Sequence, residues 1–309
     1  MKNRLLIWIL LICLFRSYQL TAQELYVHSE PASPFPKGLV SVRYSMESYQ
    51  DESIRRHWHA VRVLYGVTGN FYVIGSYSLS NHHPQKYPSN PYSYFVNHHS
   101  RGYNPDYRLK SEGFHLFCLY RLYSKDEPNG HIRIAITGEG SYSNTAHDEA
   151  EPHLLGDNSG YGGSVIVTKL IKKLALNIKA GFINPLDYNQ PQDQIKFRSG
   201  NARYAIFSTG YLLYPKVYES YDDVNLNIYL EMVYKEYDEA SLYINKKYED
   251  IEVFPFLRDG RYLEARPGIQ VILNSRDRID LSAGFTVWGN TFLRANPTVY
   301  LNFQKYLFK

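Results

Sequence analysis

The chain has 309 residues, with 34 basic and 30 acidic side chains. Residues 1–23 have the features of a secretory signal peptide: Lys2 and Arg4 precede an apolar run over residues 5–15, and residues 21–23 form a small-residue cleavage site. Without this segment, which carries Lys2, Arg4 and Arg16 but no acid, 31 basic residues face 30 acidic ones. This neutral balance argues against a nucleic-acid partner. Cys118 is then the one cysteine, which excludes a disulfide framework or cysteine metal site.

Beyond residue 37, apolar and polar residues alternate with a period of two. In the clearest segment, Val224, Leu226 and Ile228 alternate with Asn225 and Asn227. Such alternation predicts strands with one apolar and one polar face. The facing of residues 203–213 is ambiguous from the pattern alone. The twelve segments that read this way cover residues 40–47, 61–67, 71–79, 114–122, 132–137, 161–170, 174–183, 203–213, 224–232, 262–273, 278–288 and 297–308.

Connections between these segments are alternately short and long. The short ones cover residues 68–70, 124–130, 171–173, 214–223 and 274–277, and the longer ones cover 48–56, 81–110, 145–160, 184–201, 239–260 and 289–294. A soluble β-sandwich would also show alternating strands, but it does not explain this order of loop lengths after a signal peptide. Short periplasmic turns and long extracellular loops are typical of outer-membrane barrels. We therefore predict an all-β, antiparallel transmembrane β-barrel of about 12 strands in the bacterial outer membrane.

The predicted organisation is a signal peptide over residues 1–23, an extended periplasmic lead-in over 24–37, and the barrel over 38–309. Pro31, Pro34 and Pro36 favour an extended lead-in. We predict no helix, no internal repeat and no second domain. The expected partners are outer-membrane lipid, the barrel-assembly machinery during biogenesis, and a small hydrophilic solute.

Several short motifs add a resemblance. Residues 24–27 (ELYV) and 30–33 (EPAS), 64–68 (LYGVT), 155–160 (LGDNSG) and 210–215 (GYLLYP) are similar to those of an uncharacterised family of Bacteroidota outer-membrane β-barrels, porin- or transporter-like. The resemblance covers most of the chain after residue 23 and implies the same fold and compartment. It assigns no catalytic or binding residue.

The polar faces of the predicted strands would line the lumen and carry both signs of charge. One interpretation is a channel with a mixed-charge constriction that passes small hydrophilic solutes. The other is a lumen filled by interlocking ion pairs, in a non-conducting barrel that acts as a surface-binding or assembly component. The candidate lumen and constriction residues are Arg43, Arg62, Arg121, Arg133, Glu139, Lys179, Glu231, Lys235, Glu264 and Arg266.

Histidines recur in the predicted extracellular segments, among them His82, His83 and His147. Two imidazoles with carboxylates can hold a transition metal. The loop over residues 145–160 is the best single candidate, with His147, Asp148, Glu149, Glu151 and His153. Because these residues follow no fixed metal-ligand spacing, a solvated polar loop is the favoured interpretation, and we predict no metal and no other cofactor.

The loop over residues 81–110 contains Tyr87, Tyr92, Tyr94, Tyr103 and Tyr107. These rings would either stack on sugars or fold inward as a constriction, and the sequence does not separate the two.

We predict that the protein is not an enzyme. Some twelve-stranded outer-membrane barrels are phospholipases that use a Ser and a His on the outer wall. Here His115 and Ser141 lie on neighbouring predicted strands, but no nucleophile motif surrounds them.

Overall fold

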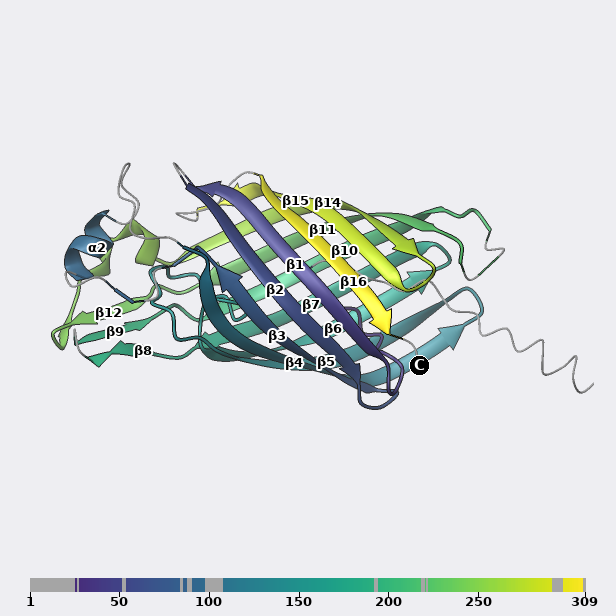
Figure 1. The fold of residues 1–309 in the computed structure, drawn as a ribbon, viewed down its shortest axis with the longest axis horizontal. Helices are drawn as coiled ribbons and strands as arrows, with labels where there is room; N and C mark the ends of the chain where they lie inside the picture. The colour runs from purple at the N-terminus through teal and green to yellow at the C-terminus, as the bar shows by residue number, and fades with distance from the viewer. Residues whose placement is uncertain are drawn as a thin grey trace, which may run out of the picture.

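Twelve antiparallel strands close into one barrel in the computed structural model, as predicted (Figure 1). The structure describes residues 26, 28–51, 54–83, 86–87, 91–97, 108–191, 194–217, 220, 222–290 and 297–307, so the predicted signal peptide lies outside the described residues. The first and last strands pair with each other, Val40 opposite Leu307, and this pairing closes the barrel. Its strands are β1 (Val40–Asp51), β2 (Ile54–Gly66), β3 (Phe71–Ser80), β4 (Lys110–Glu127), β5 (Gly130–Tyr142), β6 (Gly160–Ile171), β7 (Leu174–Pro185), β10 (Ala202–Tyr214), β11 (Asn225–Tyr237), β14 (Gly260–Leu273), β15 (Asp277–Gly289) and β16 (Thr298–Leu307).

The outer face of the wall carries an apolar belt. Val61, Leu116, Ile178 and Ile228 are each 44–54% exposed, and exposure of this kind is costly in water but favourable against lipid. Among the described residues, no helix is long and apolar enough to cross a bilayer. The belt and the closed wall identify the chain as an outer-membrane β-barrel.

The ambiguous strand β10 follows the same alternation. Phe207 and Tyr211 are exposed on the outer face, whereas Ile206, Ser208 and Leu212 are buried inside. Its two-residue alternation therefore matches that of β11, with which it pairs without a register shift as far as Leu212.

Two predicted connections differ from the structure. β1 and β2 remain paired as far as Asp51 and Ile54, so the expected long loop at 48–56 is only a two-residue connection. β4 and β5 likewise pair as far as Glu127 and Gly130, which shortens the expected turn at 124–130. In both cases polar residues that favour a loop belong to paired strands instead.

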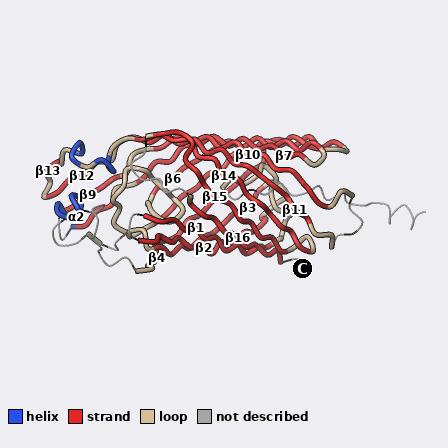
Figure 2. The backbone as a smooth tube through the Cα atoms, turned by 90° about the horizontal axis from the view of Figure 1, so that it is seen from above, coloured by secondary structure: helices blue, strands red, loops and turns tan. Residues whose placement is uncertain are grey.

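A small capping structure covers one end of the barrel (Figures 1 and 2). It contains a second sheet in the order β13-β12-β9-β8 and short helices, which the sequence analysis did not predict. Its elements are β8 (Tyr188–Gln190), β9 (Ile195–Arg198), β12 (Ser241–Ile244), β13 (Lys247–Tyr248), α2 (Pro91–Asn97), η2 (Ile251–Val253) and η3 (Pro255–Leu257).

Aromatic side chains form the core of this cap. Phe95 packs against Phe197, Phe254 and Phe256, with ring centroids 6.0–6.2 Å apart. Of the loop tyrosines, Tyr87 and Tyr94 are buried in the same cluster, Tyr92 is exposed, and Tyr103 and Tyr107 lie outside the described residues. Tyr87 and Tyr94 therefore hold the cap together and do not offer open faces for sugar stacking.

The facing of β11 can be tested with two adjacent positions. Ile228→Arg should lower the free energy of unfolding by about 2–4 kcal/mol, because it places a charge against lipid. Asn227→Arg should cost less, since Asn227 faces inward and donates to Gln270 at 3.1 Å. Urea unfolding of the barrel in lipid vesicles measures both; equal costs would contradict the facing.

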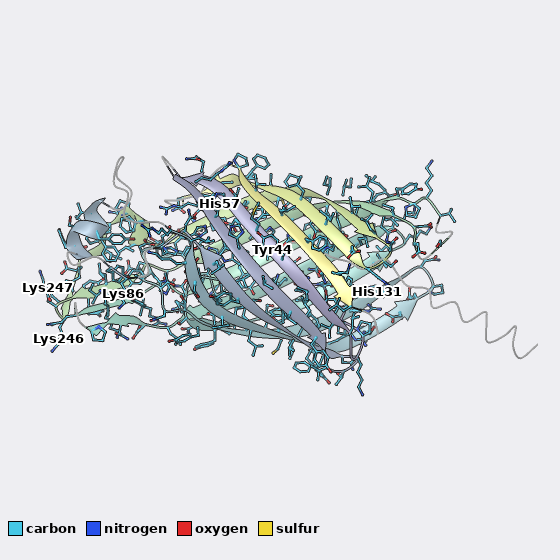
Figure 3. All side chains as sticks on the ribbon, in the orientation of Figure 1. Tyr44, His57, Lys86, His131, Lys246 and Lys247 are labelled. Carbon is cyan, nitrogen blue, oxygen red and sulfur yellow. The ribbon has the colours of Figure 1, made fainter. Side chains whose placement is uncertain are left out.

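The orientation can be tested with trypsin on intact cells. Lys246 and Lys247 are exposed at the tip of the cap, whereas His131 lies at the opposite end near the C-terminus (Figure 3). Trypsin should cut at Lys246 and Lys247 in intact cells, and at Lys172 in the short β6–β7 turn only after the outer membrane is permeabilised. Cutting at Lys172 in sealed cells would reverse the orientation.

Candidate functional site in the barrel lumen

The N-terminal segment lies inside the barrel. Tyr26, Ala32 and Phe35 are at most 6% exposed, and the Pro36 carbonyl packs against Gly66 so closely that a Cβ there would lie 2.0 Å from the oxygen. We call Tyr26 and residues 28–37 the lumen segment. This position differs from the expected periplasmic lead-in at 24–37, because the prolines indicate an extended backbone but not where that backbone runs.

Strand register places two rows of polar side chains on the inner wall. In the first row, Arg43 lies opposite both Arg62 and Gln304, and Gln304 lies opposite Arg278. The row continues from Arg62 through Ser76, His115 and Ser141. It therefore crosses seven consecutive strands, from β15 to β5.

The second row crosses the remaining five strands. Its members are opposite one another in turn: Thr168 with Asn177, Asn177 with Ser208, Ser208 with Glu231, and Glu231 with Arg266. These side chains are buried. Arg43, Arg62, Glu231 and Arg266 of these rows were predicted as lumen residues. Arg278 was not predicted although it is charged, and the Ser, Thr, Asn and Gln members carry no charge that would mark them.

Glu30 of the lumen segment binds the first row. Its carboxylate lies 2.6 Å from Nη1 of Arg43 and 3.7 Å from Nη2 of Arg62. Burial by itself would raise the pKa of Glu30, but Arg43 and Arg62 more than offset this and lower the pKa to about 2. One charged carboxylate thus sits between two arginines that face each other across the β1–β2 pair.

Ser29 and its neighbours bind the second row. The Ser29 hydroxyl is 2.8 Å from that of Ser208 and accepts from Asn177 at 3.1 Å. The backbone N–H groups of His28 and Ser29 donate to Glu231 at 3.1 and 3.2 Å, and that of Ala32 donates to Thr168 at 2.8 Å. The lumen segment is therefore held between the two rows by polar contacts on both sides.

An apolar cluster surrounds the same segment toward the short-turn end. Phe35 packs edge-to-face on Tyr72 with ring centroids 4.8 Å apart, and both belong to a buried cluster with Ala32, Leu64 and Phe117. Inward-facing aromatic and aliphatic side chains thus fill the lumen at the end where the segment enters.

The loop over residues 143–159 crosses the other half of the lumen, and we call it the crossing loop. It connects β5 to β6. Even so, a carboxylate oxygen of Glu151 lies 2.9 Å from Nζ of Lys235 on β11 and accepts a hydrogen bond from Tyr262 on β14. On the other side Gly156 packs against Trp58 on β2. Because these strands lie on different sides of the barrel, the loop spans the interior.

The other predicted lumen residues contact several different partners. Arg121 binds the β2–β3 turn through Gly69 and Asn70. Arg133 pairs with Asp126 and donates to Ser33 of the lumen segment at 2.8 Å. The remaining predicted residues each have their own partner: Glu139 pairs with His115, Glu264 with Arg266, and Lys235 with Glu151, and Lys179 lies over the rings of Phe117 and Tyr204.

Among the described residues, the five candidate metal ligands of the crossing loop do not form a group that could hold a metal ion. Asp148 accepts from Tyr94 and pairs with His83 at 2.5 Å, and His153 pairs with Glu151 at 3.0 Å. Burial lowers the pKa of His147 to about 4, whereas burial and neighbouring Asp148 raise the pKa of Glu149 to about 8. The donor atoms that do converge, among the described residues, belong to His82, His83 and Asp157.

His115 and Ser141 lie opposite each other, but on the inner wall. His115 pairs with Glu139 at 3.0 Å, and the Ser141 hydroxyl donates to the carbonyl of Asn158. These two residues therefore do not face the lipid, as the Ser and His of a barrel phospholipase would.

Comparisons with known proteins agree on the fold. No protein-family model and no curated protein sequence matches the chain. A solved outer-membrane channel from Pseudomonas putida F1 is 12% identical, with 91% of this chain and 100% of that chain covered and a TM-score of 0.56. NanC porin is 10% identical, with 87% and 99% covered and a TM-score of 0.44. KdgM porin, solved with disordered oligogalacturonate, is 9% identical, with 87% and 99% covered and a TM-score of 0.41. The chain has the fold of bacterial outer-membrane channels, and the resemblance to a Bacteroidota family stays a prediction.

The crossing loop can be tested through its ion pair with the wall. Glu151→Ala should lower the free energy of unfolding by about 3–5 kcal/mol, because it removes the carboxylate that neutralises buried Lys235. His153→Ala should cost about 0–1 kcal/mol, since its side chain is 47% exposed. Denaturant unfolding monitored by gel mobility compares the two; similar losses would mean that the loop is not anchored at Lys235.

Proposed function

We propose that the protein is an outer-membrane channel for small hydrophilic solutes, which the lumen segment holds closed. The observation that carries this proposal is the polar wall behind the segment. Thr168, Asn177, Ser208 and Glu231 form a continuous hydrophilic row, and water could hydrate that row if the segment moved away.

The segment is also held in a way that permits release. Its contacts with the second row are hydrogen bonds, and it belongs to none of the twelve wall strands. Displacing it breaks no ladder hydrogen bond between wall strands. The cost of displacement comes from the Glu30 ion pairs with Arg43 and Arg62 and from the Phe35 cluster, because burying such a ring contributes about 1.5–3 kcal/mol. The segment would therefore act as a gate that opens when these contacts break.

A non-conducting barrel that presents its cap as a surface-binding or assembly component is the second candidate. The observation that favours it is the packed interior: an apolar cluster fills the end where the segment enters, and the crossing loop spans the other half. In that case the lumen serves only as the support for the capping structure.

Conductance in planar bilayers separates the two functions. Wild type should be mostly closed, and Glu30→Gln should open more often, because it weakens the contact with Arg43 and Arg62. Glu127→Gln is the matched control, since Glu127 lies in an exposed pair at the β4–β5 turn and its loss should leave the current unchanged.

A variant without residues 28–34 provides the stronger test. It should conduct steadily if the segment is the gate. If this variant folds, as judged by heat-modifiable gel mobility, but passes no current, the channel proposal fails and the non-conducting barrel remains.

A further inference from the structure

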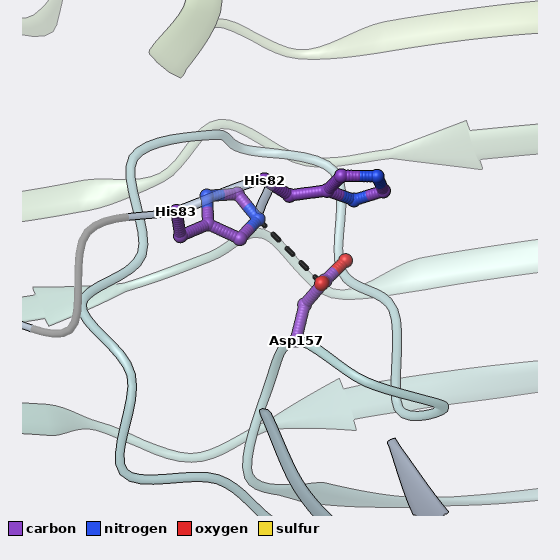
Figure 4. A group of neighbouring side chains, drawn as sticks. All are labelled: His82, His83 and Asp157. Carbon is purple, nitrogen blue, oxygen red and sulfur yellow. Dashed lines mark ion pairs between the residues drawn. The ribbon is translucent and has the colours of Figure 1, made fainter. Parts of the chain in front are cut away.

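Three metal-binding side chains meet where the crossing loop touches the wall. His82 and His83 follow β3, and Asp157 lies on the crossing loop (Figure 4). One donor atom from each residue lies within 4.8 Å of the other two. We propose that these residues bind a transition-metal ion of the zinc type, which would join the two segments.

The distance between the His83 and Asp157 donor atoms fits one shared ion. Nε2 of His83 is 3.5 Å from Oδ1 of Asp157. Two ligands of a tetrahedral zinc ion, each about 2.0–2.2 Å from the metal, are roughly 3.4 Å apart. The ion would replace a proton on Nε2 of His83; in its absence, protonated His83 can pair with both Asp157 and Asp148.

His83 is held in the orientation that a ligand needs. Its Nδ1 lies 2.5 Å from Asp148, and Asp148 also accepts from the hydroxyl of Tyr94. Metal-binding histidines generally donate their second ring N–H to a carboxylate, which fixes the tautomer and leaves the other nitrogen for the metal. Asp148 is therefore a positioning residue for this site.

His82 supplies a donor that lacks another use. In the part of the chain that the structure describes, its Nε2 has no hydrogen-bond partner although it is shielded from solvent. The His82 backbone is fixed by Ser80, which accepts from its N–H at 3.0 Å, and by Arg56, which donates to its carbonyl at 3.2 Å. A buried nitrogen without a partner is costly, and a metal ion would satisfy it.

The donor set indicates the class of ion. Two imidazoles and one carboxylate suit Zn²⁺ and its neighbours in the first transition row, whereas Mg²⁺ and Ca²⁺ prefer oxygen ligands. Three protein ligands leave at least one coordination position for water or an external ligand.

The test is titration of the purified full-length barrel, stripped with EDTA, against Zn²⁺ in competition with a chromophoric chelator. Wild type should bind one equivalent, and excess Mg²⁺ should not displace it. Asp157→Asn and His82→Ala should each bind at least 10-fold more weakly. Asp148→Asn should weaken binding by roughly 10–100-fold without removing a ligand. His59→Ala, which removes an imidazole bonded to Tyr44 on the exposed face, should leave binding unchanged.

A spectrum of wild type alone covers the case in which a variant fails to fold. Co²⁺ added to the stripped barrel should give the intense visible absorption of a four-coordinate site, and Zn²⁺ should abolish it. A wild-type barrel that binds no Zn²⁺, or a folded Asp157→Asn variant with wild-type affinity, would overturn the proposal.

Discussion

The structure depends on a single carboxylate placed between two arginines. Arg43 and Arg62 lie directly opposite each other on adjacent strands, an arrangement of like charges that destabilises a strand pair. Glu30 compensates both. Because Glu30 belongs to the lumen segment, its position fixes where the neighbouring residues lie, and Ser29 and His28 reach the second polar row on the far wall. Glu30 therefore both balances the charge of the two wall arginines and holds in place the segment that fills the lumen.

Polar contacts also hold a chain segment in the half of the barrel beneath the cap. The crossing loop is a long polar connection, yet Asp148 and Ala150 within it are fully buried. It can enter the lumen because the wall supplies Lys235 and Tyr262 for Glu151, while the cap covers it from outside with aromatic packing. Chain segments therefore lie in both halves of the lumen, and the wall supplies polar partners for each of them.

Much of the architecture could be predicted from the sequence, because the membrane imposes a simple rule. Lipid requires apolar residues at every second position, and strands such as β11 show this directly. The order of loop lengths then gives the barrel. What the lumen contains could not be predicted in this way: water, a polar wall and a folded-in segment all tolerate polar residues. Glu30 and Ser29 have no feature in the sequence that separates them from other residues of a proline-rich lead-in; only their side-chain contacts with Arg43 and Ser208 do.

The sequence likewise did not predict which of the candidate metal ligands lie close together in space. His147, Asp148 and Glu151 are close in sequence, but each meets a different partner, since an irregular loop has no fixed period that would align side chains. Asp157 instead lies beside His83, which is 74 positions earlier in the chain. The cap was missed for a related reason: β8, β9, β12 and β13 have two to four residues each, too few to show a periodic pattern.

The closure of the barrel by β1 and β16 gives the lumen segment a further property. Its binding partners lie on β1, β2, β5, β6, β7, β10, β11 and β15, so they come together only when the ring of strands is complete. The segment is in effect an intramolecular ligand for the closed ring, present at a high effective concentration because it is covalently attached to β1. A ligand that binds only one state stabilises that state. An incompletely paired sheet would lack this binding surface, so the strand pairing that completes the wall also creates the binding site of the lumen segment.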